Sequence, residues 1–298
     1  MRSVLISTGG TIAWSQRLQR MLSGAELVAR TRVSFDEVVE VASAPSWDLS
    51  LADMDRIAQS VRTAIVGGAE AVVVTHGTDT LEESAWLTEL VLGAEFRSAA
   101  GVVFTGAMRF TDDHDSDGPE NLRRALDVSQ AGARHDRGVQ VAFAGRVHAA
   151  RWVRKIDAWA LDCFDSRARP PSAPAPPHGD GRINTDVALV KVGPLCQPAL
   201  PDATGLVLEG TGAGHVPGRY HPDIANRLDS GRPVVVASRC SDPRPDPVPP
   251  DGALRAQDLT AEKAALALMV GLGVHPELVS LRSWWDELLA AGQAAGTA

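Results

Sequence analysis

Two short segments of the sequence combine threonine, glycine and acidic residues in a way that favours chemistry at a carbonyl group. The first reads STGGT at residues 7–11, and the second reads THGTDT at residues 75–80. In the second segment Thr78 stands beside Asp79, and a threonine hydroxyl needs an adjacent base or a lowered proton affinity before it can attack. Glycine lets the backbone approach a ligand closely, and N–H groups aimed at a carbonyl oxygen form an oxyanion hole. These residues predict a nucleophile or a proton relay beside a carbonyl-binding turn.

Both segments also have a less specific interpretation. The first could bind phosphate, but it lacks the pattern Gly-x-x-x-x-Gly-Lys and does not match Gly-x-Gly-x-x-Gly. Considered alone, the first segment is best interpreted as a structural glycine turn. The presence of the second segment favours a catalytic interpretation instead. His76 could act as a base. Because a lone histidine is more often a hydrogen-bonded structural residue, we interpret it as a residue that supports the site.

The elements around these segments predict an α/β fold. Apolar, β-branched runs alternate with stretches whose apolar residues recur at helical spacing. Continuous apolar strands between helices predict a mostly parallel, doubly wound sheet covered on both faces, in which ligands bind at the carboxyl ends of the strands. The expected strands that end in small, glycine-rich turns are 3–7, 71–75 and 102–105, and a further strand is expected at 139–144. The expected helices cover 51–66, 80–92 and 119–131.

A proline-rich stretch at residues 170–177 divides the chain of 298 residues, a length that fits one large or two moderate domains. Such a run excludes helix and central strand and predicts a stiff, extended connection. The strand–helix pattern resumes after it, with the next strand at 187–190. We therefore predict a larger N-terminal domain over 1–168, a proline-rich connection over 169–202 and a smaller C-terminal α/β domain over 203–298.

Six segments of the chain resemble those of a known family. The N-terminal segments are STGGTIA at 7–13, THGTDTLEE at 75–83, TGAMR at 105–109 and SDGPENL at 116–122. The C-terminal segments are GTGAGHVP at 210–217 and Ser-Arg at 238–239. In these segments, in their order and in their spacing, the sequence is similar to bacterial-type L-asparaginases and glutaminase-asparaginases, and the resemblance spans most of the chain.

The resemblance implies a role for four residues. Thr11 is the expected nucleophile, and Thr78, Asp79 and Lys155 form a second catalytic cluster, although the sequence does not decide which threonine attacks first. Lys155 is one of only three lysines among 29 basic residues, which fits a specific role, while a surface lysine remains the alternative. The residues expected to bind substrate are Gly10, Ser46, Trp47, Gly77, Asp79 and Ala107.

The chain departs from the family pattern in two places. The family carries a lid tyrosine shortly after the first motif, but the only tyrosine here is Tyr220, and WSQRLQR at 14–20 fills the lid region. Where the family has Ser-Gln-Asp, this chain has Ser46-Trp47-Asp48. An indole only donates a hydrogen bond, so Trp47 cannot accept one from an ammonium group as glutamine can. Either Trp47 packs as a structural residue or the specificity has changed.

Three hypotheses of function follow. The first is an amidohydrolase that converts L-asparagine to aspartate and ammonia through a threonine nucleophile and an acyl-enzyme. The second is a hydrolase of the same fold that acts on a different or larger amide, which the missing lid tyrosine and Trp47 motivate. The third is a sensor that binds asparagine or aspartate without turnover.

The composition and net charge of the chain limit the partners and the cellular location that we expect. A net charge of −8 disfavours binding to nucleic acid or to anionic membranes. The three cysteines are not closely spaced and predict neither a disulfide framework nor a zinc site. The longest apolar runs are shorter than the roughly 18 residues of a membrane span. No signal peptide is recognised in the sequence, so a cytoplasmic location is expected.

Two further features leave alternatives open. The acidic segment 112–117 could suggest a metal site, but we interpret it as a solvated loop in which Asp117 caps or supports the site, and we expect no metal and no cofactor. The family resemblance implies a homodimer or homotetramer with sites at the subunit interface. The apolar segment 281–289, with Trp284 and Trp285, fits such an interface or a core.

Overall fold

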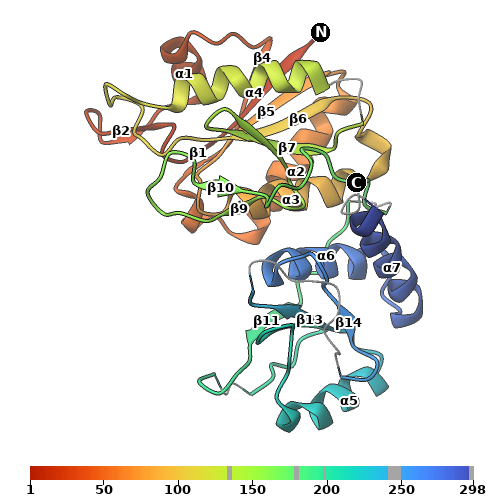
Figure 1. The fold of residues 1–298 in the computed structure, drawn as a ribbon. Helices are drawn as coiled ribbons and strands as arrows, with labels where there is room; N and C mark the ends of the chain where they lie inside the picture. The colour runs from red at the N-terminus through yellow and green to blue at the C-terminus, as the bar shows by residue number, and fades with distance from the viewer. Residues whose placement is uncertain (133–135, 178–180, 197–198, 241–249, 295–298) are drawn as a thin grey trace. The chain divides into compact units, whose positions relative to one another are not determined.

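The computed structural model describes residues 1–132, 136–177, 181–196, 199–240 and 250–294. Two compact units divide the chain, Met1–His178 and Gly179–Ala298, and both are α/β structures (Figure 1). The predicted fold class, a larger mostly parallel sheet domain followed by a smaller α/β domain, is confirmed. The segment 169–202, predicted as a connection, also contains β11 (Val187–Lys191), a strand of the second unit.

The first unit contains a six-stranded sheet with the order β4-β1-β5-β6-β7-β8. Neighbouring strands are parallel except β7 and β8, which form an antiparallel pair. The strands are β1 (Ser3–Gly9), β4 (Glu37–Ala44), β5 (Ala71–Thr75), β6 (Gly101–Thr105), β7 (Val139–Phe143) and β8 (Arg146–Ala149). The sequence predicted the strands that are buried throughout. It missed β4, which lies at the sheet edge and carries exposed acidic residues at Glu37 and Glu40.

Helices cover both faces of this sheet (Figure 1). Side chains alternate along a strand, so Val4 and Ile6 face one core cluster while Leu5 faces the other. The first cluster includes residues of α2 (Leu51–Val66) and α3 (Leu81–Leu92). The second includes residues of α1 (Gly24–Thr31) and α4 (Gly118–Gly132).

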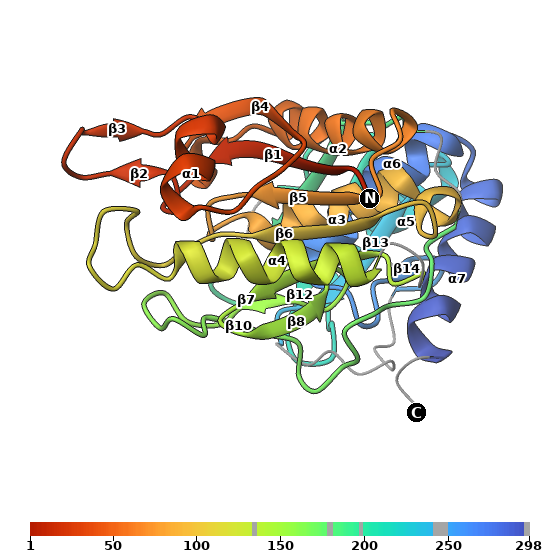
Figure 2. The ribbon, with the colours of Figure 1, turned by 90° about the horizontal axis from the view of Figure 1, so that it is seen from above.

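Two small antiparallel pairs complete the first unit. The lid hairpin, defined here as residues 14–21, consists of β2 (Trp14–Ser15) and β3 (Arg20–Met21). Figure 2 shows this hairpin beyond the carboxyl end of β1. The second pair consists of β9 (Arg154–Lys155) and β10 (Phe164–Asp165).

The second unit contains a parallel four-stranded sheet with the order β11-β12-β13-β14. Its further strands are β12 (Gly205–Gly210), β13 (Val234–Ser238) and β14 (Leu254–Arg255). Ile224 of α5 (His221–Asp229) joins one core cluster with these strands, and Leu268 of α6 (Ala261–Val274) packs at Gly205. Leu281 and Trp284 of α7 (Leu278–Ala294) pack at Gly271 of α6.

The apolar segment near the end of the chain belongs to this core. Trp284 and Trp285 are 4% and 0% exposed, and the indole nitrogen of Trp285 donates to the carbonyl of Arg255 at 2.8 Å. Of the two interpretations that the sequence left open, the packing favours the core.

Candidate active site

The turns after β1, β5 and β6 pack directly on one another. Gly10 has φ of +79°, in the left-handed region that favours glycine, and a side chain there would collide with the backbone of Gly77. A Cβ atom at Gly77 would lie 2.6 Å from the Ser46 hydroxyl, and one at Gly106 would collide with the carbonyl of His76. The glycines therefore let three strand ends and the Ser46 segment approach one another.

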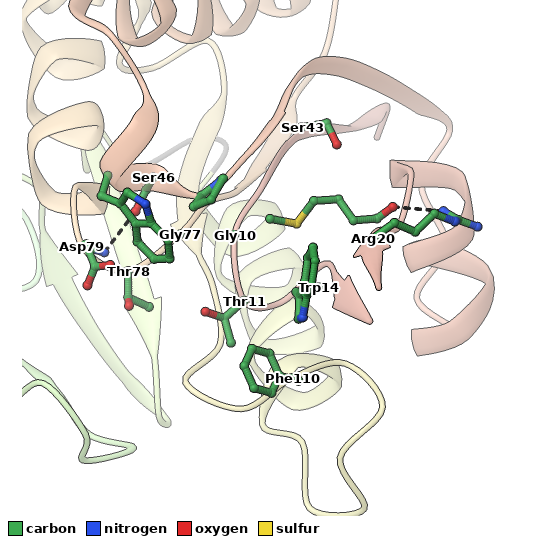
Figure 3. A pocket seen from close by; sticks show the side chains of 13 residues that line it. Gly10, Thr11, Trp14, Arg20, Ser43, Ser46, Gly77, Thr78, Asp79 and Phe110 are labelled. Atoms are coloured by element: carbon green, nitrogen blue, oxygen red, sulfur yellow. Dashed lines mark hydrogen bonds between the residues drawn. The ribbon is translucent and has the colours of Figure 1, made fainter. Parts of the chain in front are cut away.

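A pocket of about 600 Å³ opens beside these turns (Figure 3). Seven of the candidate catalytic and substrate-binding residues predicted from the sequence line this pocket. They are Gly10, Thr11, Ser46, Trp47, Gly77, Thr78 and Asp79. The remaining lining residues are Trp14, Arg20, Met21, Ser43, Pro45 and Phe110.

Lys155 reaches the second threonine turn from β9. Its Nζ donates to Thr78 Oγ1 at 2.8 Å and to Asp79 Oδ1 at 2.6 Å. The Lys155 side chain is 17% exposed, whereas Asp79 is 45% exposed and open to the pocket. The backbone N–H of Lys155 donates to Glu82 in the first turn of α3. An ammonium thus lies between a hydroxyl and a carboxylate, an arrangement that can hold and pass protons.

Ser46 connects the segment after β4 to the second turn. Its hydroxyl accepts a hydrogen bond from the Asp79 N–H at 3.2 Å, and its carbonyl accepts one from the Thr80 hydroxyl at 2.9 Å. Ser46 is almost fully buried, but the adjacent Trp47 is 68% exposed. Trp47 therefore lies at the pocket and not in the core.

Thr11 lies at the centre of the pocket lining in Figure 3, where Thr78 and Asp79 stand on one side of it and Trp14 and Phe110 on the other. The Trp14 N–H donates to the Gly10 carbonyl at 3.1 Å. This bond keeps the lid hairpin close to the first turn.

His76 is fully buried behind the second turn. Its Nδ1 lies 2.8 Å from the Gly77 carbonyl oxygen, and its Nε2 lies 2.9 Å from the Ser84 hydroxyl. Burial lowers the pKa of His76 to about 4, although the hydrogen bond to Gly77 opposes that shift. A neutral imidazole with both nitrogens engaged fixes the turn and does not face the pocket lining.

Asp117 holds the third turn from the start of α4. Its carboxylate accepts from the N–H groups of Met108 and Arg109 at 3.0 and 2.9 Å. Asn121 donates to the same carboxylate and to the Gly106 carbonyl, at 3.1 and 3.0 Å. The side chain of Ala107, expected near the substrate, is fully buried in the core and is not among the residues that line the pocket.

The other acidic residues of segment 112–117 bind protein donors. Asp112 accepts from the Ser15 hydroxyl at 2.9 Å and from the N–H groups of Gln16 and Arg17 at 3.0 and 2.8 Å. The hydrogen bond from Arg17, the strongest cause, lowers the pKa of Asp112 to about 2. Within the described part of the chain, no group of three or more His, Cys, Asp or Glu side chains is placed to hold a metal ion.

Sequence reasoning missed several residues of this site. Met21 and Phe110 line the pocket, and the sulfur of Met108 lies 3.6 Å from Thr78 Oγ1. Phe110 directly follows the motif at 105–109, so its position after a strand end could have indicated it. The role of Asp112 at the lid hairpin had no such signal, because its partners are 95 to 97 residues away in sequence.

Comparison with known proteins identifies the family. The protein-family model "Asparaginase, N-terminal" matches residues 2–186, and the protein-family model "Glutaminase/Asparaginase C-terminal domain" matches residues 186–284. A probable L-asparaginase from Deinococcus radiodurans is 32% identical, over 94% of this chain and 96% of its own. The thermostable L-asparaginase from Thermococcus kodakarensis has a TM-score of 0.80 at 23% identity, over 98% and 99% of the two chains. The chain belongs to the asparaginase family, and it is an amidohydrolase.

A second kind of relative is also similar. One of the subunits of a glutamyl-tRNA(Gln) amidotransferase, from Methanosarcina mazei, is 27% identical, over 96% of this chain and 77% of its own. Among the described residues, no helix is both long and apolar enough to cross a membrane.

Proposed function

We propose that this enzyme hydrolyses the side-chain amide of L-asparagine to aspartate and ammonia, with Thr11 as nucleophile. The observation that carries the proposal is the position of Lys155 Nζ, within hydrogen-bond distance of both Thr78 and Asp79, in a cluster that opens on the same pocket as Thr11. A threonine that lines a pocket with a proton relay meets the requirement for nucleophilic catalysis.

The reaction has two steps. Thr11 Oγ1 forms a bond to the side-chain carbonyl carbon, the carbon–nitrogen bond breaks, and ammonia leaves with a proton passed through Thr78 and Lys155. Water then cleaves the acyl-enzyme ester, which releases aspartate and restores the Thr11 hydroxyl. Backbone N–H groups of Thr11 and Thr78 stabilise the oxyanion that forms in each step.

Ser46 and Asp79 bind the amino-acid end of the substrate in this proposal. The Ser46 hydroxyl accepts from the Asp79 N–H, so its hydrogen remains to donate to a substrate carboxylate. The exposed carboxylate of Asp79 meets the α-ammonium group. Neither interaction requires an acceptor at Trp47, the residue that departs from the family pattern.

An ammonia-release assay with L-asparagine, L-glutamine and their D-isomers tests this function. Thr11→Ala is expected to reduce kcat at least about a thousandfold, because it removes the attacking oxygen, while the unfolding midpoint stays close to that of the wild type. Turnover that is unchanged in this variant would remove Thr11 from its role. Binding of aspartate by folded wild-type protein without hydrolysis of any amide would instead favour the sensor hypothesis.

We also propose that the enzyme is a homodimer or homotetramer with its sites at subunit interfaces. Three apolar side chains on the loop after Lys155 support this: Ile156, Trp159 and Leu161 are 62%, 90% and 38% exposed. Large apolar side chains that are exposed together on one loop are consistent with a protein contact surface. Light scattering at micromolar concentration measures the mass, and a monomer would contradict the proposal. The net charge of −8 disfavours a nucleic-acid partner.

A cytoplasmic location completes the proposal. All three cysteines, Cys163, Cys196 and Cys240, are free thiols, and free thiols are typical of a reducing compartment. Fractionation of the native cells, followed by detection of the protein in each fraction, tests this location.

A further inference from the structure

The pocket beside Thr11 is large for free asparagine. Its volume of about 600 Å³ falls within the range of roughly 300–1,000 Å³ that is typical of sites for drug-sized ligands. A small amino acid held at Ser46 and Asp79 occupies only one end of such a space. Within one chain, the rest of the pocket therefore leaves room for a substrate larger than asparagine.

The two ends of the pocket differ in chemistry. Thr78, Asp79 and Ser46 supply hydroxyl and carboxylate groups at one end, and Thr11 separates them from Trp14 and Phe110 (Figure 3). We define the aromatic wall as Trp14 and Phe110. For a substrate whose amide carbon is held at Thr11 and whose amino-acid end is held at Asp79 and Ser46, the aromatic wall is the part of the pocket on the other side of the reacting carbon.

The aromatic wall is held in place by hydrogen bonds. The Thr111 N–H donates to the Trp14 carbonyl at 3.2 Å, which joins the segment of Phe110 to the lid hairpin. Asp112 accepts three hydrogen bonds from residues 15–17, immediately after Trp14. A wall fixed before substrate arrives loses little conformational freedom on binding, so its contacts contribute more to affinity.

We propose that the enzyme also takes secondary β-amides of aspartate, in which the amide nitrogen carries an apolar, aromatic group that packs on the aromatic wall. This inference rests on the proposed function, because it uses the same nucleophile and the same binding of the amino-acid end. Thr11 Oγ1 bonds to the acyl carbon, the carbon–nitrogen bond breaks, and the arylalkyl amine leaves with a proton in place of ammonia. Water then releases aspartate.

The test compares L-asparagine with its N4-benzyl derivative as substrates of the full-length enzyme. Aspartate and benzylamine are measured by chromatography. The kcat/KM for the benzylamide is expected to lie within about tenfold of that for asparagine, because contacts between an apolar group and an apolar pocket raise kcat/KM by about tenfold or more. Trp14→Ala is expected to lower the ratio of the two kcat/KM values, benzylamide over asparagine, at least about tenfold.

Leu18→Ala is the matched control. Leu18 is an apolar residue of the same hairpin, 45% exposed, and it is not among the residues that line the pocket, so its variant is expected to keep the wild-type ratio. Phe110→Ala should lower the ratio as Trp14→Ala does, and it carries the test if the Trp14 variant does not fold.

The outcomes separate this inference from the proposed function. Hydrolysis of asparagine with a benzylamide kcat/KM below about a thousandth of the asparagine value overturns the inference alone, since the wall would then reject the substituent. A ratio unchanged in both wall variants also overturns it. No hydrolysis of either compound by folded protein overturns the proposed function and the inference together. Hydrolysis of the benzylamide alone supports the inference and overturns free asparagine as the substrate.

Discussion

The threonine turns and the lid hairpin border the same pocket but are held in place by different means. The turns are fixed by backbone packing, because Gly10, Gly77 and Gly106 leave no room for a side chain between neighbouring strand ends. The lid hairpin has only a two-residue ladder of its own. Besides backbone hydrogen bonds at Trp14, the carboxylates of Asp112 and Glu26 tie it to the rest of the unit.

This difference separates the chemistry of the site from its selectivity. Packing between strand ends does not titrate and changes little unless a side chain is added. A loop held mainly by side-chain carboxylates depends on the ionisation of those groups and on their acceptor geometry. We therefore expect changes in the turns to affect turnover strongly, and changes at the hairpin to affect mainly substrate binding.

Lys155→Met should have the largest effect among the changes that sharpen this comparison. It removes the donor to Thr78 and Asp79, so kcat should fall about a hundredfold to ten-thousandfold, the usual worth of a positioned proton-transfer group. Lys155→Arg should stay impaired, since a guanidinium does not give up its proton near neutral pH. Steady-state ammonia release measures both variants.

Lys191→Met is the control for this prediction. Lys191 is a largely exposed lysine of the second unit that pairs with Glu209, and its loss should leave kcat unchanged. If Lys155→Arg turned over at the wild-type rate, Lys155 would contribute only charge, and proton transfer would have to be assigned to another group.

Gly77→Ala should have the next largest effect, because it tests the packing of the turns directly. A Cβ atom there would lie 2.6 Å from the Ser46 hydroxyl and 2.8 Å from the Ser46 Cβ, so the turn or the Ser46 segment must shift. A displacement of about 1 Å in a catalytic group can cost about a hundredfold in rate, and kcat/KM should fall by that order. Gly218→Ala, where a Cβ meets nothing within 4 Å, should retain wild-type kinetics; equal values for both variants would refute the packing argument.

Much of the fold could be predicted from the sequence because its local signals agree with its packing. Helix α2 covers the predicted residues, Leu51–Val66, and β5 and β6 cover the predicted strands at Ala71–Thr75 and 102–105, with one more residue at the start of β6. Buried strands and helices are indicated by their apolar pattern. The two strands of the six-stranded sheet that were missed, β4 and β8, contain exposed residues, so their pattern resembles that of a loop.

The site could be predicted only where its residues lie in contiguous motifs. The two threonine turns are local in sequence, and each lies at the end of a strand. The contact of Lys155 with Thr78 spans 77 residues, and only family resemblance indicated it. The acidic segment 112–117 shows the limit. Asp117 was expected to support the site, but nothing in the spacing indicates that Asp112 accepts backbone hydrogen bonds while His114 is exposed.

Asp112→Asn should have the smallest effect on rate, and it isolates the hairpin from the turns. An amide has one acceptor oxygen and two N–H donors, so it cannot accept all three hydrogen bonds that the carboxylate accepts. The hairpin should loosen, KM should rise by about threefold to tenfold, roughly the worth of one lost hydrogen bond, and kcat should change little. Limited trypsin digestion at neutral pH should cleave faster after Arg17 and Arg20, which are exposed on the hairpin.

The stability of the lid hairpin is expected to depend on pH through the ionisation of Asp112. The pKa of Asp112 is lowered from its usual 3.8 to about 2, so ionised Asp112 favours the ordered hairpin fully above pH 3.8, and this contribution is lost as the pH falls toward about 2. Pepsin digestion of the wild type should therefore accelerate at the hairpin between these values. The Asn variant should show a smaller change, because only the Arg20–Glu26 pair, in which the hydrogen bond from Arg20 lowers the pKa of Glu26 to about 2, still titrates there. Asp127→Asn, at an exposed position of α4, is the control for charge. Equal trypsin cleavage of wild type and Asp112→Asn would mean that contacts other than the carboxylate hold the hairpin, and the contrast with the turns would then fail.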